Sequence, residues 1–462
     1  MIGRRSALGG LGMGVVGGMT AATLAAGTSA ANAATISTWP MLPKPILGPR
    51  INFPQADKIM TQLGLDAIVV GGGVNLYHAT GLDLTAPRMG HTPGVYAVIT
   101  RNDKQRLSLI APAFLYYYTI AIDHRDQGYP AYVYTAPEAG ESLSKGTVEP
   151  VAAKLSKFND RGEAKLDFIE SSRAQIVEKT MAKQPPSASM VFALRKALND
   201  AGVTKGRIAV DLPPVHQTTA EAAPEATIVN ADDALRKIRP VKSAVEIELM
   251  RQAAHNNAEA VKEAVRTMRA GADVRELRAS YFAAVAMRGM RGVFMVIDRV
   301  SSPAYEAKFR EGQCFSVDCV SEYAGYHGDY ARAVFVGEPP ASMKKVTAAT
   351  GKAWDIVRES IKPGVTFSEV QAKGRAALKA MGADYNISFT PHSVGLYHAD
   401  HVGDSGLPPP ADMTLEPGMI LSVDCPLLEA GAGGSSHLED LTLITKDGFE
   451  SLNDIGDKII MV

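Results

Sequence analysis

Short apolar runs alternate with amphipathic stretches in the first half of the chain. Strands are predicted at residues 66–70, 95–100, 107–111 and 207–210, where apolar side chains follow one another between polar or glycine-rich segments. Helices are predicted at residues 51–64 and 187–201, with Ser187 as the N-cap of the second helix. Alternating strands and helices are typical of an α/β layer arrangement, which we therefore predict for residues 34–235.

Several helix-start signals occur in the second half of the chain, residues 236–462. Capping boxes, in which a Ser, Thr or Asp precedes a Glu by three residues, occur at residues 243–246, 273–276 and 366–369. The last two boxes lie 93 residues apart in similar sequence surroundings. Each box begins a predicted helix, and a β region carrying two acidic residues follows each helix. This pattern predicts an internal duplication, in which two helix–helix–hairpin halves face each other around a pseudo-twofold axis.

The acidic residues of these β regions lie on two predicted hairpins. If residues 313–320 and 326–336 pair around a turn near Ala324, Asp318 lies diagonal to Asp329 on one face of the sheet. In the second half, strands at residues 419–425 and 437–444 would bring Asp424 and Glu439 together in the same way.

One histidine completes this predicted set, since His392 comes from the segment between the two hairpins. Four carboxylates at one point cannot all stay ionised unless positive charge lies among them. Oxygen ligands with an imidazole suit Mn, Fe, Co or Zn. The sequence therefore predicts a site for two divalent metal ions, with Asp318, Asp329, His392, Asp424 and Glu439 as ligands.

The first 33 residues have the features of a twin-arginine signal peptide. Arg4 and Arg5 precede a weakly hydrophobic, Gly/Ala-rich run, and Ala31-Asn32-Ala33 has the form of a cleavage site. We therefore expect an exported, periplasmic protein whose mature part does not enter a membrane. Removing this segment takes away two positive charges and leaves a net charge of −3. A nearly neutral chain without a basic stripe argues against nucleic acid as a partner.

Several motifs, in this order, resemble one known family. Residues 236–462 resemble the pita-bread metallopeptidases, which include Xaa-Pro aminopeptidase, prolidase and creatinase, and residues 51–235 resemble their creatinase-like amino-terminal domain. The first motif runs from Val317-Asp318-Cys319 to Asp329, with an eleven-residue spacing between the two aspartates. The others are Pro391-His392-Ser393-Val394-Gly395, Pro417 to Pro426, His437-Leu438-Glu439-Asp440 and, in the amino-terminal part, residues 64–70 and 75–81.

The resemblance implies a role for each ligand. Asp318 would chelate one metal ion, Asp329 and Glu439 would bridge both ions, and His392 and Asp424 would complete the other. Position 424 would also carry a proton during catalysis. The resemblance further implies a small peptide or amide substrate and a homodimer.

The chain departs from the family at positions that affect the chemistry. Asp424 stands where the family has Glu, so its carboxylate reaches ~1.5 Å less, one C–C bond length. Peptidases of the family have a substrate-contacting histidine near the position of Ser301, where this chain has none. Ala331 and His437 replace a threonine and an arginine of the family's motifs. His398 or His401 would supply a second substrate-contacting histidine, with His398 preferred.

Three functions are compatible with these residues. The first is a dinuclear metallohydrolase, aminopeptidase-like, that cleaves a small peptide or amide bond. The second keeps the fold and the metal but carries out a non-peptidase C–N hydrolysis or a lyase reaction, as the departures at Ser301 and Asp424 would allow. The third is a non-catalytic binding protein, which retention of all four acidic positions and His392 disfavours.

Overall fold

The structure is a computed structural model that describes residues 44–84, 94–135, 149, 164–400, 412–453 and 456–462. The predicted signal peptide, residues 1–33, lies outside the described residues, and so does His401. The domain division near residue 235 stays a prediction, although one sheet lies wholly before that point and two sheets lie wholly after it.

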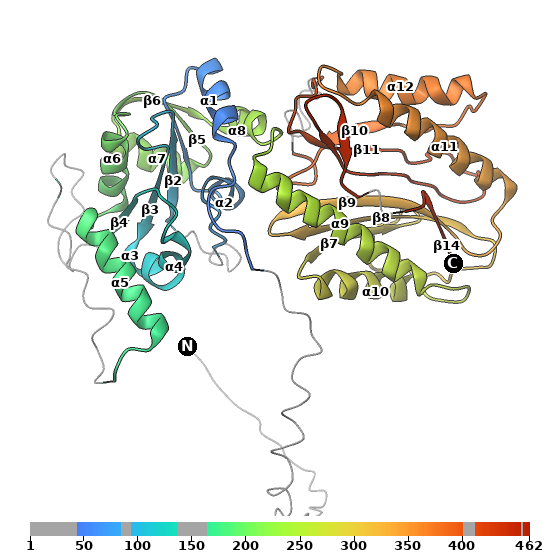
Figure 1. Ribbon diagram of the computed structural model, residues 1–462, viewed down its shortest axis with the longest axis horizontal. Coiled ribbons are helices and arrows are strands. Elements are labelled where there is room, and N and C mark those ends of the chain that lie inside the picture. The colour runs from blue at the N-terminus through green and yellow to red at the C-terminus, as the bar shows by residue number, and fades with distance from the viewer. Residues whose placement is uncertain (1–43, 85–93, 136–148, 150–163, 401–411, 454–455) are drawn as a thin grey trace, which may run out of the picture. The chain divides into compact units, whose positions relative to one another are not determined.

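A six-stranded mixed sheet with the order β4-β3-β2-β1-β5-β6 organises the first part of the chain (Figure 1). Its strands are β1 Ala67–Val70, β2 Tyr96–Thr100, β3 Leu107–Pro112, β4 Ala131–Tyr134, β5 Lys205–Val210 and β6 Glu225–Asn230. Its helices are α1 Phe53–Gln62, α2 Gly73–Thr80, α3 Ala113–Leu115, η2 Tyr116–Ile120, α4 Ala121–His124, α5 Phe168–Lys183, α6 Met190–Asp200, α7 Pro213–Ala222 and α8 Asp232–Ile238. The predicted α/β arrangement of this part is confirmed.

Apolar side chains cover both faces of this sheet. In β1, Val69 packs into a core with α6 and α7, whereas Ile68 and Val70 pack into a second core with α1, α2 and α8. Successive side chains of a strand point to opposite faces, so the uninterrupted apolar run of β1 is what a strand buried between two helical layers requires.

The predicted cap of α6 was wrong by two residues. Ser189, not Ser187, is the N-cap, and its hydroxyl accepts a hydrogen bond from the amide of Phe192. The backbone of Ser187 instead bonds to β4, because its amide donates to the carbonyl of Val133 and its carbonyl accepts from the amide of Thr135. An extended residue that pairs with a strand edge delays the start of the helix.

The second part repeats one order of elements. Helices α9 Ala244–Arg266 and α10 Val274–Met287 precede the strands β7 Arg291–Ile297, β8 Cys314–Tyr323 and β9 Tyr326–Phe335. Helices α11 Ala341–Ser360 and α12 Phe367–Ala380 then precede β10 Thr390–Ser393, β11 Ile420–Asp424 and β12 Thr442–Ile444, with β13 Phe449–Ser451 and β14 Ile459–Met461 at the end. The predicted recurrence of two helices followed by an antiparallel sheet is confirmed (Figure 1).

Local sequence signals set the ends of several of these elements. All three predicted capping boxes are formed, with Ser243, Asp273 and Thr366 as the N-caps of α9, α10 and α12. The turn between β8 and β9 consists of Ala324 and Gly325, both at positive φ (47° and 80°). Two left-handed residues give a primed turn that matches the twist of a hairpin, so the chain reverses where the sequence predicts.

A buried ion pair fixes the segment that follows β10. Arg239, directly after α8, donates from Nε to Asp400 Oδ1 at 2.6 Å and from Nη1 to Asn75 Oδ1 at 2.9 Å. The ammonium group of Lys242 lies 4.0 Å from the other oxygen of Asp400. Burial raises the pKa of Asp400, but these two cations outweigh it and hold the pKa below its ordinary value. Arg239 and Lys242 thus compensate the charge of Asp400, which lies two residues after His398.

Cys314, Cys319 and Cys425 are free and buried. Among the helices of the described segments, none combines the length and the apolar character that crossing a membrane requires.

Close packing of α9 on β9 depends on Gly328. A Cβ atom at this position would lie 2.2 Å from the carbonyl oxygen of Ala253 and 2.8 Å from Cβ of Asn257. Because backbone on α9 cannot move aside locally, we expect Gly328→Ala to lower the free energy of unfolding by about 1–3 kcal/mol. Chemical denaturation measures this change.

The matched control is Gly448→Ala. A Cβ at Gly448 meets no atom within 4 Å, so this variant should unfold at the wild-type denaturant concentration. Equal stability of the two variants would show that the helix is not seated against the sheet through Gly328.

Candidate metal centre

The register of β8 and β9 brings the first two predicted ligands together. Asp318 pairs with Ala331, and Val320 pairs with Asp329. The two aspartates are therefore diagonal neighbours on one face of the sheet, as predicted. Asp329 is completely buried.

The second half supplies the remaining three predicted ligands. In the ladder of β10 and β11, His392 pairs with Ser422 and Asp424 pairs with Thr390, so His392 and Asp424 are also diagonal neighbours. Glu439 also makes backbone contacts with the first half. Its backbone exchanges hydrogen bonds of 3.2 and 3.3 Å with Ala331 of β9.

The strand predicted at residues 437–444 is therefore shorter than expected. Its regular part begins at Thr442, as β12. Before it, Leu438 still accepts a hydrogen bond from the amide of Cys425, and Glu439 forms a bridge with Ala331 of the other half. Glu439 thus joins the two halves through its backbone.

The imidazole of His392 lies among three of the carboxylates. Its Nε2 is 3.3 Å from Glu439 Oε1, 3.5 Å from Asp424 Oδ2 and 3.6 Å from Asp329 Oδ2. Asp318 joins the group on the opposite side of Glu439, where potential ligand atoms of Asp318, His437 and Glu439 lie within 4.8 Å of one another. The structure thus brings all five predicted ligands into one cluster, while the role of each ligand stays a prediction.

His437 is a member of the cluster that the sequence did not identify as a ligand. Its Nε2 lies 3.3 Å from Asp424 Oδ1 and its Nδ1 lies 3.8 Å from Asp318 Oδ2. The signal was present, because residues 437 and 439 are two apart in an extended segment and share a face. In the family's motifs, position 437 was notable only because histidine replaces an arginine there.

His398, the preferred substrate-contacting histidine, lies against the same cluster. Its Nε2 is 3.0 Å from Asp329 Oδ2, and its ring contacts that of His392 with the centroids 4.8 Å apart. Burial lowers its pKa, but the hydrogen bond to Asp329 and the charges of the aspartates outweigh this effect and raise the pKa to about 9. His401 lies outside the described residues, so the choice between the two rests on the position of His398.

Arg299 is a second residue that the sequence analysis missed. Together with Asp318, Asp424 and His437 it lines a pocket of about 390 Å³. Asp298 and Arg299 both have positive φ (51° and 67°), and Ser435 donates a hydrogen bond to Asp298. Ser301 is exposed on the loop that follows. Arg278 Nη1 donates to the carbonyl of Ser301 at 3.4 Å, whereas Arg299 reaches the pocket from a strained turn two residues before Ser301.

Burial and mutual repulsion raise the pKa of two acidic residues, whereas the nearby histidines lower that of a third. Burial, with the negative charges of Asp329, Asp424 and Asp318, raises the pKa of Glu439 well above its usual range. Burial, together with Asp329 and Asp424, raises the pKa of Asp318 to about 6 against the attraction of His437. For Asp424 burial again acts upward, but the close imidazole of His437 and the charge of His392 outweigh it, and its pKa is lowered.

The donor set fits a divalent cation. Asp318 Oδ1, Asp329 Oδ1 and His437 Nε2 are buried and have no hydrogen-bond partner among the described residues. Polar atoms buried without partners cost free energy, and they converge here from both halves of the fold. Carboxylate oxygens with imidazole nitrogens suit Mn, Fe, Co and Zn. These residues would hold such an ion and recover the cost.

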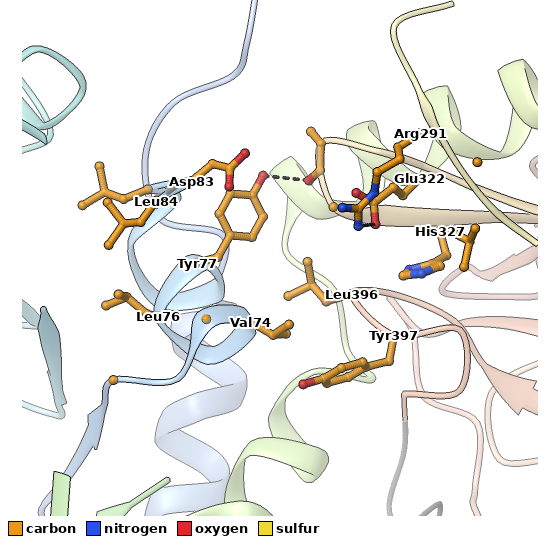
Figure 2. Close-up of a pocket in the computed structure, with 17 residues that line it drawn as sticks. Val74, Leu76, Tyr77, Asp83, Leu84, Arg291, Glu322, His327, Leu396 and Tyr397 are labelled. Carbon is orange, nitrogen blue, oxygen red and sulfur yellow. Dashed lines mark hydrogen bonds and ion pairs between the residues drawn. The ribbon is translucent and has the colours of Figure 1, made fainter. Parts of the chain in front are cut away.

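A larger cavity, of about 600 Å³, is shown in Figure 2. His327, two residues before Asp329, and Tyr397, next to His398, line it together with Val74, Leu84, Leu396 and other residues. The guanidinium of Arg291 lies 2.7 Å from Glu322 at one side of the cavity. Figure 2 also shows Tyr77 of α2, whose hydroxyl donates to the carbonyl of Ala324 at 2.7 Å. The pocket with Arg299 reaches the predicted ligands, whereas this cavity is a neighbouring apolar space.

A duplicated α/β fold with carboxylates and imidazoles gathered between its halves defines a metal-dependent hydrolase of the pita-bread class. Residues 248–446 match the model of metallopeptidase family M24. A protein of Mycobacterium tuberculosis named "Probable dipeptidase PepE" is 31% identical over 266 residues, which are 54% of this chain and 68% of that protein. The chain belongs to metallopeptidase family M24.

Other relatives agree with this assignment. The Xaa-Pro dipeptidase of Pyrococcus furiosus is 26% identical over 230 residues, which are 48% of this chain and 65% of that protein. A solved dipeptidase structure from Pyrococcus horikoshii superposes with a TM-score of 0.61 at 17% identity and covers 89% of this chain and 99% of that chain. The structural likeness extends the shared fold to the six-stranded sheet, beyond the matched residues 248–446.

The pKa of Asp318 yields a test in metal-free protein. A carboxyl whose pKa rises from 3.8 to about 6 on folding destabilises the folded state above that range and has no effect below it. Metal-free Asp318→Asn should therefore be more stable than metal-free wild type at pH 7, by roughly 1–3 kcal/mol. The difference should shrink as the pH falls through this window and vanish near pH 4. Urea denaturation in chelator at several pH values measures it, and a difference independent of pH would contradict the proposed charge repulsion.

Proposed function

We propose that this protein is a metal-dependent dipeptidase that uses two divalent cations. The observation that carries the proposal is the convergence of five ligand residues from both halves of the fold, with buried atoms that lack partners. The names of the M24 relatives support short peptides as substrates, since several of them are dipeptidases. Mn, Fe, Co and Zn are all compatible with the donor set.

The bound cations would polarise the scissile carbonyl and increase the acidity of a water molecule. The protein's own groups would position the substrate and move the proton. Asp424 is half-exposed at the pocket and lies 3.3 Å from His437, which makes it the carboxylate best placed to accept a proton from the attacking water and pass it to the leaving nitrogen. His398, held by Asp329, would donate a hydrogen bond to the substrate.

Arg299 gives this pocket a site for a carboxylate. Its guanidinium lines the pocket that opens on Asp318 and Asp424, and a guanidinium binds a carboxylate with two hydrogen bonds. A free carboxylate one residue beyond the scissile bond is a feature of dipeptides and not of longer chains. The apolar cavity of Figure 2 would take an apolar side chain of the substrate.

A non-peptidase C–N hydrolase or lyase is the second candidate. The observation that favours it is the replacement of the family's glutamate and histidine by Asp424 and Ser301, because both changes fall where the substrate and the proton carrier meet. A panel of dipeptides, including Xaa-Pro, separates the two candidates from each other.

The decisive experiment combines chelation with this panel. Protein purified without added metal should hydrolyse at least one dipeptide after addition of Mn, Co or Zn, and a chelator should abolish the activity reversibly. Asp329→Asn should lower kcat/KM by roughly 100-fold or more, since it removes a buried ligand charge. His255→Ala, at an exposed position on α9, is the control and should retain wild-type activity.

Two results would contradict the proposal. A protein that retains no divalent metal and ignores chelators is not a metallopeptidase in function. A metal-loaded protein that cleaves no dipeptide but turns over other small amides would favour the second candidate.

Export to the periplasm through the twin-arginine route and assembly as a homodimer complete the proposal. Arg4 and Arg5, ahead of the Gly/Ala-rich run, support the first. Replacing both arginines by lysine should leave the protein in the cytoplasm of a twin-arginine-competent host, as cell fractionation would show. Unchanged periplasmic yield would indicate another route, and light scattering on the mature protein would test the dimer.

A further inference from the structure

Two imidazoles flank the same two carboxylates from opposite sides. His392 faces Asp424 Oδ2 at 3.5 Å and Glu439 Oε1 at 3.3 Å. His437 faces the other oxygens of the same groups, Asp424 Oδ1 at 3.3 Å and Glu439 Oε2 at 3.8 Å. Each carboxylate therefore presents one oxygen to each imidazole, and Asp318 lies on the side of His437 alone.

The backbone fixes the position of His437. The amide of Cys425 donates to the carbonyl of Leu438 on one side, and Glu439 is paired with Ala331 on the other. The side chain of His437 is nine-tenths buried. Its Nε2 has no hydrogen-bond partner among the described residues, although Asp424 Oδ1 is near, because the geometry is poor for a hydrogen bond. A buried nitrogen that lacks a partner and points among carboxylate oxygens is placed as a ligand atom.

We propose that His437 is a metal ligand and forms one of two cation positions with Asp318 and Glu439. This proposal rests on the proposed function in requiring that cations bind in the cluster. It assigns one imidazole to each cation, His392 to the first and His437 to the second. The arginine that the family resemblance places here could not ligate a cation, so the second position has a different donor set in this chain.

Two consequences follow from an added nitrogen ligand. The second cation position should bind Co and Zn in preference to Mn and Mg, because imidazole binds the later metals more strongly. The position of His437 beside Asp424 also compensates for the shorter side chain at residue 424, since the nitrogen occupies part of the distance that a glutamate would span.

The test compares metal binding in four full-length proteins. They are the wild type, His437→Leu, which removes the donor atom, His437→Arg, which restores the residue typical of the family motif, and the exposed control His255→Leu. Each is freed of metal with chelator, loaded with Co or Zn, separated from free metal and analysed for metal content. Competition with a metal-sensitive dye gives the affinities, and the visible ligand-field spectrum of bound Co reports the donor set.

The wild type and His255→Leu should hold two ions and give the same Co spectrum. His437→Leu and His437→Arg should each lose one ion or bind it at least ~10-fold more weakly, and the Co spectrum should lose the contribution of the second position. Circular dichroism verifies folding. If the leucine variant does not fold, the arginine variant carries the test, because the family fold accommodates arginine there.

The outcomes separate this proposal from the proposed function. If the His437→Arg protein binds both ions with wild-type affinity and an unchanged Co spectrum, His437 is not a ligand, while the metal-dependent function stands. If the wild type binds no ion in any condition, both proposals are overturned.

Discussion

The burial of like charges is the constraint on which the second half of this protein depends. Asp329 and Glu439 are almost inaccessible to water, and Asp318 and Asp424 lie within a few ångströms of them. Bringing charged carboxylates out of water costs several kcal/mol each unless opposite charge compensates them. The histidines supply part of that compensation, and the raised pKa of Glu439 shows that it is incomplete. Divalent cations would supply the rest.

The fold provides what this cluster needs by joining two similar halves through their backbones. The β8–β9 ladder holds Asp318 and Asp329 in register, and the β10–β11 ladder holds His392 and Asp424. Glu439 pairs with Ala331, so the ligand that lies between the two imidazoles also ties one half to the other. Arg332 reinforces this contact, because its guanidinium donates to the carbonyl of Glu439 and to the buried carboxylate of Asp440. Position and charge at the site are therefore set by the same contacts that close the fold.

Much of this arrangement was predictable because it is encoded locally. Capping boxes need four residues, and the hairpin that aligns Asp318 with Asp329 needs only a turn at Ala324 and strands of ordinary length. The start of β12 was not predictable in this way, because Glu439 bridges to Ala331, more than a hundred positions earlier in the sequence. Arg299 was not predictable either, because it meets Asp424 and His437 only at a pocket formed by segments distant in the sequence. The cap of α6 was wrong for a related reason, since Ser187 is held by β4 rather than by its own helix.

The departures from the family's motifs acquire a common explanation in this geometry. Asp424 is short, but His437 stands beside it, and Ser301 is exposed, but Arg299 reaches the pocket. Basic side chains thus lie near both departures, which favours altered metal or substrate preference over loss of the proposed activity.

The most direct test of the central claim is anomalous diffraction from crystals of the full mature protein grown with Co or Zn. The account requires two anomalous peaks inside the cluster, one next to His392 and one next to His437, with Glu439 between them. A map without anomalous density, in which the carboxylates are separated or satisfied by hydrogen bonds alone, would contradict it.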